Sequence, residues 1–562
     1  MDHYNPKKIF MLFFIYSMVA NLAGDPKPDF LSRANSHFEF TSSNLPIIGI
    51  DTHGKEIVDP YRIEADLGII YNGKGQRNFL SDPFNHYNGK IGIEIRGSTA
   101  AAFPKKPYRF ETHDSLGNDL NVSLLGMPAE NDWVLYNPFS DKALIRNVLA
   151  YQLSNDIGRY ASRTKLCEVV LNGKYQGVYV LMEKLKRDRN RVAISAMDSA
   201  DIAGDALTGG YIIKIDKTAG EQVGGWISNK RVRYQYHYPK PSDIVPAQEQ
   251  YIQQFMDAFE QVMSSDYYAD PDSGYSKYID LDSFVDYFIL NEVSRNIDGY
   301  RLSAFMYKDR DSKQGKLTMG PVWDFNLSFG NADYYDGYKV DGWNLAVLLD
   351  GIGGDAFQTP FWWRVLGEDA QFQSRLSIRW WELRNNQLDV NRLLRYIDAL
   401  ADTLEEAQQR NFEIWPILGY PVWPNYFVGE TFAEEIEFLK EWLVERIEWL
   451  DQQIPLLINT AVSADRQPLQ PEFSLEQNFP NPFNSTTLIK YYLPVATRVQ
   501  IKIFNMLGQE VIQLMDTFQT AGAQSIIWDG TCQNGEIVPS GVYACQVIVG
   551  SQVKMRKMLY IQ

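Results

Sequence analysis

The stretch GPVWDFNLSFG, residues 320–330, places the ionisable Asp324 between two large aromatic side chains. Its apolar start is typical of a buried strand, and the end of such a strand usually excludes an acid, since an unpaired buried charge costs several kcal/mol. Polar Asn326 and Ser328 follow on alternate positions. The rest of the chain must therefore supply partners that explain why an acid is tolerated there.

The composition describes a globular protein that does not bind nucleic acid. With 562 residues, the chain is long enough for roughly three or four domains. Hydrophobic residues make up 45% and charged residues 22%, which argues against a disordered or fibrous chain. The net charge of −16 argues against a nucleic-acid partner, because phosphate binding needs clustered Lys and Arg. The 13 Trp and 33 Tyr fit either a ligand-contacting surface or a Trp-rich core.

The N-terminus has the features of a secretory signal peptide. Lys7 and Lys8 precede an apolar run over residues 9–20, and small residues follow it. We expect cleavage after Ala23, so that residues 1–23 are removed. The run is shorter than the about 20 apolar residues that a spanning helix needs, and no later segment is apolar enough. We therefore expect an exported protein with no integral membrane segment after signal removal.

The three cysteines are few for a secreted chain. Cys532 and Cys545 lie near each other in sequence and could pair, which would leave Cys167 alone. The hydrophobic cores must then provide the stability without a disulfide framework.

Strands dominate the first part of the chain. Residues 48–57 and 91–112 alternate apolar and polar positions between glycine-containing turns. CEVVLNGKYQGVYVLMEKL, residues 167–185, predicts a hairpin whose turn is Asn172-Gly173. Another strand pair is expected in residues 301–325, and Asp324 lies at its end.

Helices are expected elsewhere in the main body. DKALIRNVLAYQLSNDIG predicts a helix with Asp141 as its N-cap and Gly158 as its stop. From about residue 246 the pattern is mostly helical, and long helices close the body near residue 455. A linker, residues 456–471, then leads to a last domain, residues 472–562, whose period-two pattern and regular turns predict a small β-sandwich.

Two familiar kinds of catalytic site are not expected. GIIYNGKG, from Gly68 to Gly75, nearly matches a phosphate-binding loop, but it lacks the Ser or Thr that would hold Mg²⁺. Residues 69–71 also look like part of a strand. The six histidines are scattered, and there is no H-E-x-x-H or G-x-S-x-G pattern. A histidine-based triad or zinc site is therefore improbable.

The remaining candidates are acids and cations. Arg96 and Lys106 flank a small-residue turn, Asp298 follows a predicted helix, and Asp324 ends the next hairpin. Phosphoryl transfer requires such a set: a cation for the phosphates, a carboxylate for the acceptor hydroxyl and another for Mg²⁺. The order along the chain is also that of a two-lobed kinase. Spacing alone, however, favours the alternative that these are ordinary solvated charges.

Several separate motifs carry a resemblance to a known family. They are IEIRGSTAAAFPKKPYRFET, ENDWVLYNPFSDKALIRNVLAYQLSNDIGRYASR, VVLNGKYQGVYVLMEKLKRDRNRV, NIDGYRLSAFMYKD and GPVWDFNLSFGNADYYDG. In this order, over about residues 45–455, they resemble the CotH family of spore-coat-type atypical protein kinases. The resemblance implies secreted protein kinases that use ATP and a divalent metal, Mg²⁺ or Mn²⁺, on a reduced kinase-like fold.

The resemblance also assigns roles to residues. Asp298 resembles the catalytic-loop acid and Asp324 the metal-binding acid. Lys106 resembles the strand lysine that meets the phosphates, with Arg96 beside it in the same turn. Glu183 lies in MEKL, which resembles the linker on the adenine side. Among these residues, Asp298 would be catalytic, and Arg96, Lys106 and Glu183 would bind the cofactor.

Two departures from the family pattern affect the expected metal site. Members often read WDxD where this chain has Asn326, whose amide oxygen can meet a metal but adds no charge. Ser303 stands five residues after Asp298, where a kinase would place its second metal-binding Asn. Members also often read RGNSS where Arg96 is followed by Gly-Ser-Thr and three alanines. An inactive, pseudokinase-like binding module therefore stays an alternative.

The last domain carries a second resemblance. FSLEQNFPNPFNSTTLIKYYLP, VQIKIFNMLGQEV, SGVYACQVIVG and KMRKMLYIQ are similar to the type A sorting domains of the type IX secretion system. The resemblance implies passage through the type IX machinery, common removal of the domain, and release or surface attachment of the remainder. A sugar-binding sandwich appended to an enzyme is the alternative.

Together these features predict an α+β protein. We expect a two-lobed kinase-like domain, residues 24–455, followed by a small all-β immunoglobulin-like sandwich. The first hypothesis is transfer of the ATP γ-phosphate to Ser or Thr of a co-secreted or surface protein. The second is a catalytically inactive surface or adhesion module that binds protein or glycan.

Overall fold

The computed structural model of the protein describes residues 39–217, 224–352, 355–461, 473–493, 497–506, 508–519, 522–549 and 552–561. The chain divides into two units, residues 1–461 and 462–562. The expected signal peptide, residues 1–23, lies outside the described residues. Within them, no helix combines the length and the apolar character that a membrane span requires.

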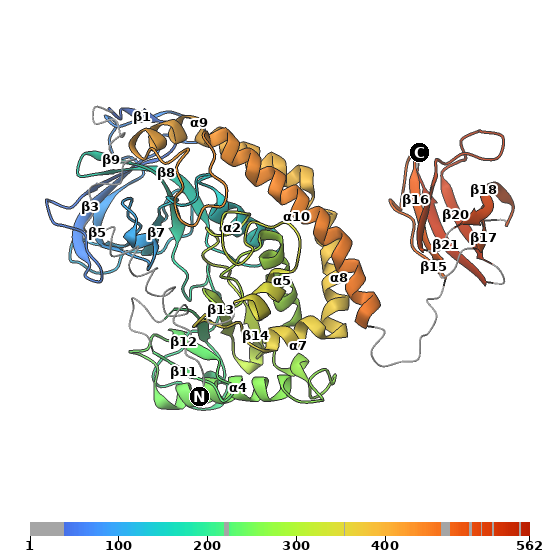
Figure 1. Ribbon diagram of the computed structural model, residues 1–562, viewed down its shortest axis with the longest axis horizontal. Coiled ribbons are helices and arrows are strands. Elements are labelled where there is room, and N and C mark those ends of the chain that lie inside the picture. Colours follow the sequence, from blue (N-terminus) through green and yellow to red (C-terminus); the bar gives the residue numbers. More distant parts are fainter. Residues whose placement is uncertain are drawn as a thin grey trace, which may run out of the picture. The chain divides into compact units, whose positions relative to one another are not determined.

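The alternating segments near the N-terminus form a closed seven-stranded barrel in the order β2-β3-β5-β6-β7-β9-β8 (Figure 1). The barrel closes because β2 pairs antiparallel with β3 on one side and parallel with β8 on the other. Its apolar positions form a buried core of their own. The barrel strands are β2 (Ile47–Asp51), β3 (Ile63–Ile70), β5 (Tyr87–Ile95), β6 (Tyr108–His113), β7 (Asp132–Tyr136), β8 (Thr164–Leu171) and β9 (Lys174–Glu183). Strands β1 (Ser42–Ser43) and β4 (Asn78–Phe79) form a separate pair.

Two sequence predictions for the barrel are confirmed. Of residues 69–71 in the near-match to a phosphate-binding loop, Ile69 and Ile70 lie within β3 as expected, and Tyr71 directly follows the end of the strand. The β8–β9 hairpin turns at Asn172 and Gly173, whose φ angles are 50° and 74°. Positive φ at both central positions is the conformation for which Asn-Gly is favoured, because it matches the twist of the flanking strands.

A second sheet, in the order β11-β12-β10-β13-β14, lies in the same unit (Figure 1). In its antiparallel register, Ile215 is opposite Ala304 and Met306 is opposite Met319. The last residues of β10 and β14 therefore lie at the same end of the sheet as the first residues of β13. The strands are β10 (Tyr211–Ile215), β11 (Gly225–Ile227), β12 (Arg233–Tyr238), β13 (Ala304–Lys308) and β14 (Leu317–Met319).

Helix α2 (Arg146–Asp156) starts later than the sequence predicts. Leu144 has a φ of 63°, a left-handed conformation that an α-helix cannot contain. Asp141 is therefore not the N-cap, although its carboxylate still accepts the Arg146 backbone N–H at 2.8 Å and pairs with the Arg146 guanidinium at 2.6 Å. Gly158, with a φ of 90°, follows the helix end as expected.

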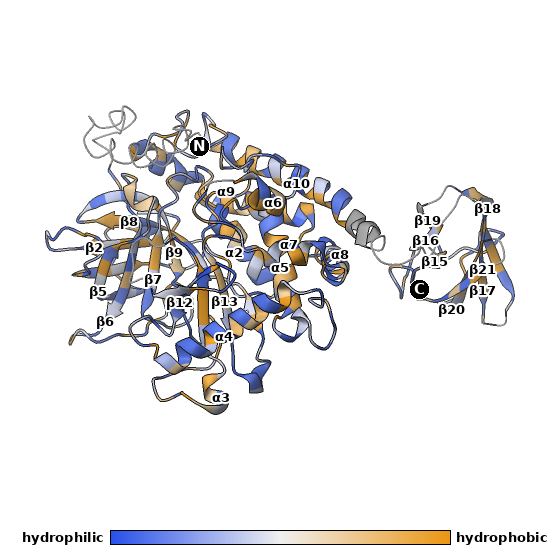
Figure 2. Cartoon of the chain, turned by 60° about the horizontal axis from the view of Figure 1, so that its bottom comes forward, coloured by the Kyte–Doolittle hydropathy of each residue, from blue (hydrophilic) through white to orange (hydrophobic). Residues whose placement is uncertain are grey.

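The helices share one large core with the second sheet and with part of the barrel wall. Along α10, buried apolar residues recur every three or four positions, and in Figure 2 the helix carries hydrophilic and hydrophobic stretches in turn.

Beyond α2, the α-helices are α3 (Gly204–Leu207), α4 (Pro246–Met263), α5 (Leu281–Ser294), α6 (Asn344–Ala346), α7 (Trp362–Glu368), α8 (Ala370–Arg384), α9 (Val390–Ile414) and α10 (Phe432–Ala461). The short helices are η3 (Ala100–Ala102), η4 (Tyr275–Lys277), η5 (Asp311–Lys313) and η6 (Val347–Gly351). Because α10 reaches Ala461, the start of the predicted linker is helical.

The second unit consists of two antiparallel sheets, β15-β16-β19 and β18-β17-β20-β21. Buried residues from both sheets form a single hydrophobic core. The strands are β15 (Ser474–Leu475), β16 (Thr487–Leu493), β17 (Thr497–Asn505), β18 (Glu510–Gln519), β19 (Gly522–Trp528), β20 (Gly541–Val549) and β21 (Gln552–Tyr560). Cys532 and Cys545 are not bonded to each other, and Cys167 is also a free thiol.

Candidate functional site

The loop that carries Asp324 follows β14, and its backbone forms hydrogen bonds with side chains of α2. The Asp324 backbone N–H donates to the Tyr151 hydroxyl at 3.0 Å, and the Phe325 N–H donates to Asn147 Oδ1 at 2.6 Å. Asn147 and Tyr151 are four residues apart, so they lie on the same face of α2. Asp324 has a φ of 63°, a left-handed conformation that Asp and Asn adopt more readily than most residues. The helix therefore fixes the backbone of the loop and leaves the Asp324 side chain to project from it.

The Asp324 carboxylate has no hydrogen-bond partner within the described part of the chain. The side chain remains accessible to solvent, yet many protein atoms surround it. Loss of hydration is the first cause that raises the pKa of Asp324, to about 6, and repulsion from Asp298 and Asp216 adds to it. Arg96 and Lys217 act in the opposite direction. The absence of accepted backbone N–H bonds argues against a turn-capping role for this carboxylate.

Asp298 lies in the loop between α5 and β13. Its backbone N–H donates to Asn296 Oδ1 at 3.2 Å, which closes a tight turn after the helix. Its Oδ1 lies 3.3 Å from Arg301 Nη2, and Arg301 also pairs with Asp355 at 3.0 Å. The structure therefore brings Asp298 close enough to Asp324 for the two charges to interact, although 26 positions separate them in sequence.

A third acid, Asp216, joins these two and was missed in the sequence. It follows β10 directly, and the strand register places it beside Ser303. Its Oδ1 accepts the Ser303 backbone N–H at 3.4 Å, and its Oδ2 lies 3.1 Å from Lys214 Nζ. The available signal was an acid at the end of the apolar run YIIKI, the same pattern that singled out Asp324. Only the strand register shows that the end of β10, which leads to Asp216, and the end of β14, which leads to Asp324, lie at the same end of the sheet.

The predicted metal ligands Ser303 and Asn326 flank this group of acids. Ser303 has a φ of 47°, and its contact with Asp216 comes from its backbone N–H. The Asn326 carbonyl oxygen accepts a hydrogen bond from Asn331 Nδ2 at 2.7 Å, which fixes the backbone after Asp324. Neither contact occupies the side chain that would meet a metal, so both roles stay predictions.

The two predicted phosphate-binding cations differ in their surroundings. The Arg96 guanidinium lies 5.3 Å from the centre of the Trp323 ring, next to Asp324, and its charge acts on that carboxylate. Lys106 Nζ instead donates to the Ala101 carbonyl at 2.8 Å within its own loop, and burial lowers its pKa. The structure thus brings Arg96 to the acids, whereas the hydrogen bond of Lys106 turns its ammonium group back on η3.

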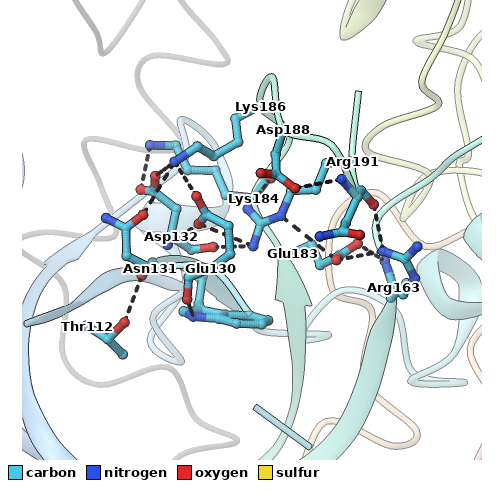
Figure 3. A network of polar contacts seen from close by, with 12 residues as sticks. Thr112, Glu130, Asn131, Asp132, Arg163, Glu183, Lys184, Lys186, Asp188 and Arg191 are labelled. Carbon is cyan, nitrogen blue, oxygen red and sulfur yellow. Dashed lines mark hydrogen bonds and ion pairs between the residues drawn. The ribbon is translucent and has the colours of Figure 1, made fainter. Parts of the chain in front are cut away.

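Glu183 is buried at the end of β9 within a network of ion pairs (Figure 3). Its carboxylate is 2.8 Å from Arg163 and 3.9 Å from Arg191, and it accepts the Tyr160 hydroxyl at 3.2 Å. Arg191 continues the network toward Glu130 at 3.4 Å. These contacts give Glu183 a structural function, because removing one partner of a buried pair leaves an uncompensated charge. A role in nucleotide binding stays a prediction.

One other group of side chains has metal-binding geometry. Within the described residues, single ligand atoms of Glu111, His113 and Asp119 lie within 4.8 Å of one another on β6 and the turn that follows. The Arg62 guanidinium already pairs with Glu111, so a metal ion would have to replace a cation that is in place. The ligand atoms of Asp216, Asp298 and Asp324 do not all lie within 4.8 Å of one another.

Both units of the chain match models of known protein families. The family model described as CotH kinase protein matches residues 93–450, and the model described as secretion system C-terminal sorting domain matches residues 477–562. No curated protein matches the chain.

Three of the solved structures that match do so over short segments of this chain. Latent dimeric PorU from Porphyromonas gingivalis is 19% identical and covers 17% of this chain and 10% of its own, with a TM-score of 0.15. FlgD from P. aeruginosa is 21% identical, with 17% and 76% covered and a TM-score of 0.13. PorZ from Porphyromonas gingivalis is also 21% identical, with 16% and 12% covered and a TM-score of 0.13. TM-scores this low give no evidence about the fold of this chain.

The sorting domain shows where the protein is delivered. It directs export through the type IX secretion machinery to the cell surface or the extracellular space. The other family match, over residues 93–450, spans more than half of the chain. The protein therefore belongs to the CotH kinase protein family.

Proposed function

We propose that the protein transfers the γ-phosphate of ATP to Ser or Thr hydroxyl groups of a protein in the same extracellular or surface compartment. The observation that carries the proposal is the Asp324 carboxylate, which lies among two other acids and two cations without a hydrogen-bond partner in the described residues. Acids that repel one another persist where a divalent cation neutralises them, and cations beside them suit phosphate.

Four residues of the site have a definite task in this proposal. A bound divalent ion would neutralise the phosphate charge during transfer. Asp324 would hold that ion, with Asn326 as a neutral neighbouring ligand. Asp298 would orient the acceptor hydroxyl and take its proton, and its contact with Arg301 at 3.3 Å holds the carboxylate in place. Arg96 would contact the phosphates from its position over Trp323.

The burial pattern of the loop also fits a site that binds a ligand from solvent. Asp324 is accessible to solvent, whereas Val322 and Phe325 on either side of it are buried. The loop therefore anchors itself by its apolar residues and presents the acid outward, which is the arrangement that a ligand from solvent needs.

A second candidate function is a catalytically inactive binding module. Two observations favour it: Lys106 is bonded within its own loop, and stacked aromatic pairs lie on the surface. Trp423 is 45% exposed and stacks on Tyr334 at 5.8 Å, and Tyr426 is 50% exposed and stacks on Tyr338 at 4.1 Å. Exposed aromatic rings of this kind suit protein or glycan surfaces.

Nucleotide binding by the purified mature chain separates the two functions. We expect ATP to bind in the presence of Mg²⁺ or Mn²⁺ and to bind much more weakly with EDTA, measured by isothermal titration calorimetry. Asp324→Asn should abolish the metal dependence. Asp272→Asn, which changes an exposed acid between α4 and α5, is the matched control and should bind as the wild type does. If the protein binds no nucleotide in the presence of either metal, the inactive binding module is favoured.

A further inference from the structure

The dipeptide Asp216-Lys217 is held rigidly at the end of β10. The Gln235 side-chain amide, on β12, donates to the Asp216 carbonyl at 2.7 Å and to the Lys217 carbonyl at 3.1 Å. Gln235 is buried, so this clamp is shielded from water. The Asp216 carboxylate adds contacts to Ser303 and to the Lys217 backbone N–H, the latter at 2.9 Å. Contacts from β12 and from Ser303, the residue before β13, thus hold the backbone from which the Lys217 side chain starts.

Among the residues that the structure describes, none occupies the Lys217 ammonium group. It has no hydrogen bond or ion pair with any residue that the structure describes, although it is close enough to Asp324 for its charge to act on that carboxylate. Lys106 differs, because its ammonium donates to the Ala101 carbonyl. Lys105 differs as well, because its buried ammonium donates to the Val178 carbonyl and to Asn411.

A lysine in this position suits a phosphate group. Its ammonium is a compact charge on a flexible stem, which lets it follow a phosphate oxygen from a fixed backbone. A phosphate that shares a metal ion with Asp324 would lie within reach of a cation that already interacts with the same carboxylate. Hydrogen bonds between ionised groups are about twice as strong as neutral ones, so such a contact would contribute measurably to affinity.

We infer that Lys217 is the phosphate-binding lysine of this site, in the role that the sequence resemblance gave to Lys106, and that Gln235 positions it. The inference rests on the proposed function and deepens it: the ligand is the polyphosphate part of a nucleotide. Lys217 lies outside the kinase-like order of motifs that the sequence analysis used, because it comes from β10 and not from the small-residue turn that follows β5.

The test compares ligands with and without phosphates. Titrations of the full mature chain with Mg²⁺-ATP, inorganic tripolyphosphate and adenosine should show a loss of affinity on the order of ten- to hundredfold for the first two in Lys217→Gln. Adenosine binding should not change. Lys217→Arg should restore part of the affinity, since it keeps the charge. Lys174→Gln, on the exposed β8–β9 hairpin, is the matched control and should match the wild type.

Gln235→Leu tests positioning separately. It should weaken tripolyphosphate binding in the wild-type background and have no further effect in Lys217→Gln, because the lysine that it positions is then absent. If Gln235 has only a structural role, Gln235→Leu should weaken tripolyphosphate binding in both the wild-type and the Lys217→Gln backgrounds.

The outcomes distinguish this inference from the function on which it rests. If Mg²⁺-ATP binds and depends on Asp324, but Lys217→Gln binds like the wild type while Lys106→Gln does not, the inference is overturned and the proposed function stands. If the wild type binds neither Mg²⁺-ATP nor tripolyphosphate, the proposed function fails and the inference fails with it. Unchanged melting temperatures in the variants show that the comparison is between folded proteins.

Discussion

Asp324 combines a left-handed backbone with a carboxylate that carries a raised pKa. Both features restrict what can replace it. Asn is the closest substitute because it tolerates positive φ and keeps the shape of the side chain while removing its charge. Alanine would add backbone strain to the loss of the carboxylate, so its effect would be harder to interpret.

Replacing Asp324 with Asn should abolish metal-dependent phosphoryl transfer without destabilising the protein. The amide keeps the Tyr151 contact, which comes from the backbone, and it removes a charge that neighbouring acids repel. We expect the melting temperature in EDTA at pH 7.5 to stay the same or to rise, measured by calorimetry. Full metal-dependent transfer by the variant would show that this carboxylate is not the metal ligand.

The pKa of Asp324 makes a directional prediction for pH. Because it is raised from 3.8 to about 6, the folded state binds the proton more tightly than the unfolded state, and this group stabilises the fold below pH 3.8. That contribution is lost as the pH rises through about 6. In EDTA, the melting temperature of the wild type relative to Asp324→Asn should therefore fall between pH 4 and pH 7. A constant difference over this range would contradict the assignment.

At the scale of elements, the site depends on α2 more than on the strands that lead into it. Tyr151 and Asn147 accept the two consecutive backbone N–H groups that set the direction of the Asp324 side chain. The Tyr151 ring also stacks on Trp323 at 6.0 Å. A change in α2 should thus alter the metal site without touching any metal ligand.

Tyr151→Phe tests this coupling, because it removes one hydroxyl and keeps the ring. The Asp324 N–H loses its acceptor, which should lower stability by no more than about 3 kcal/mol. We expect a weaker metal-dependent affinity for ATP, with adenosine binding unchanged. The control is Tyr267→Phe at an exposed position, which should change neither quantity. Equal metal dependence in Tyr151→Phe and the wild type would show that α2 does not position the acid.

The elements show which predictions the sequence could support. The hairpin at Asn172-Gly173 and the strand at Ile69 and Ile70 were predictable, because turn chemistry and period two are local signals. The start of α2 was not, because the left-handed Leu144 follows from tertiary contacts. Asp324 stood out as an acid among aromatics. Asp216 did not, because its role depends on the pairing of β10 with β13 across 89 positions of sequence.

At the scale of the whole molecule, the two units have separate cores. The buried core of residues 473–560 shares no member with the cores of the first unit among the described residues. A unit with its own core is expected to fold without the other. Family resemblance predicted the division into an enzyme-like body and an export domain, whereas composition predicted only that the chain has several domains.

Truncation after Ala461 should therefore separate folding from export. The shortened protein is expected to keep the melting temperature of the first unit and its metal-dependent ATP binding, and to accumulate inside the cell envelope. Cell fractionation and calorimetry of the purified product measure the two effects. Unchanged delivery to the surface would contradict the sorting role of the last domain, and loss of folding would contradict the independence of the cores.

The three acids come together where the ends of paired strands meet. This arrangement also determines when the protein can act. Residues 216, 298 and 324 come together only when β10, β13 and β14 have paired, and contacts between distant segments form late in folding. A chain that is still unfolded during synthesis or transport has the three acids on separate stretches of polypeptide. On the proposed function, nascent chains would be inert toward the nucleotide pool of the cytoplasm, and maturation itself would act as the switch that confines activity to the destination.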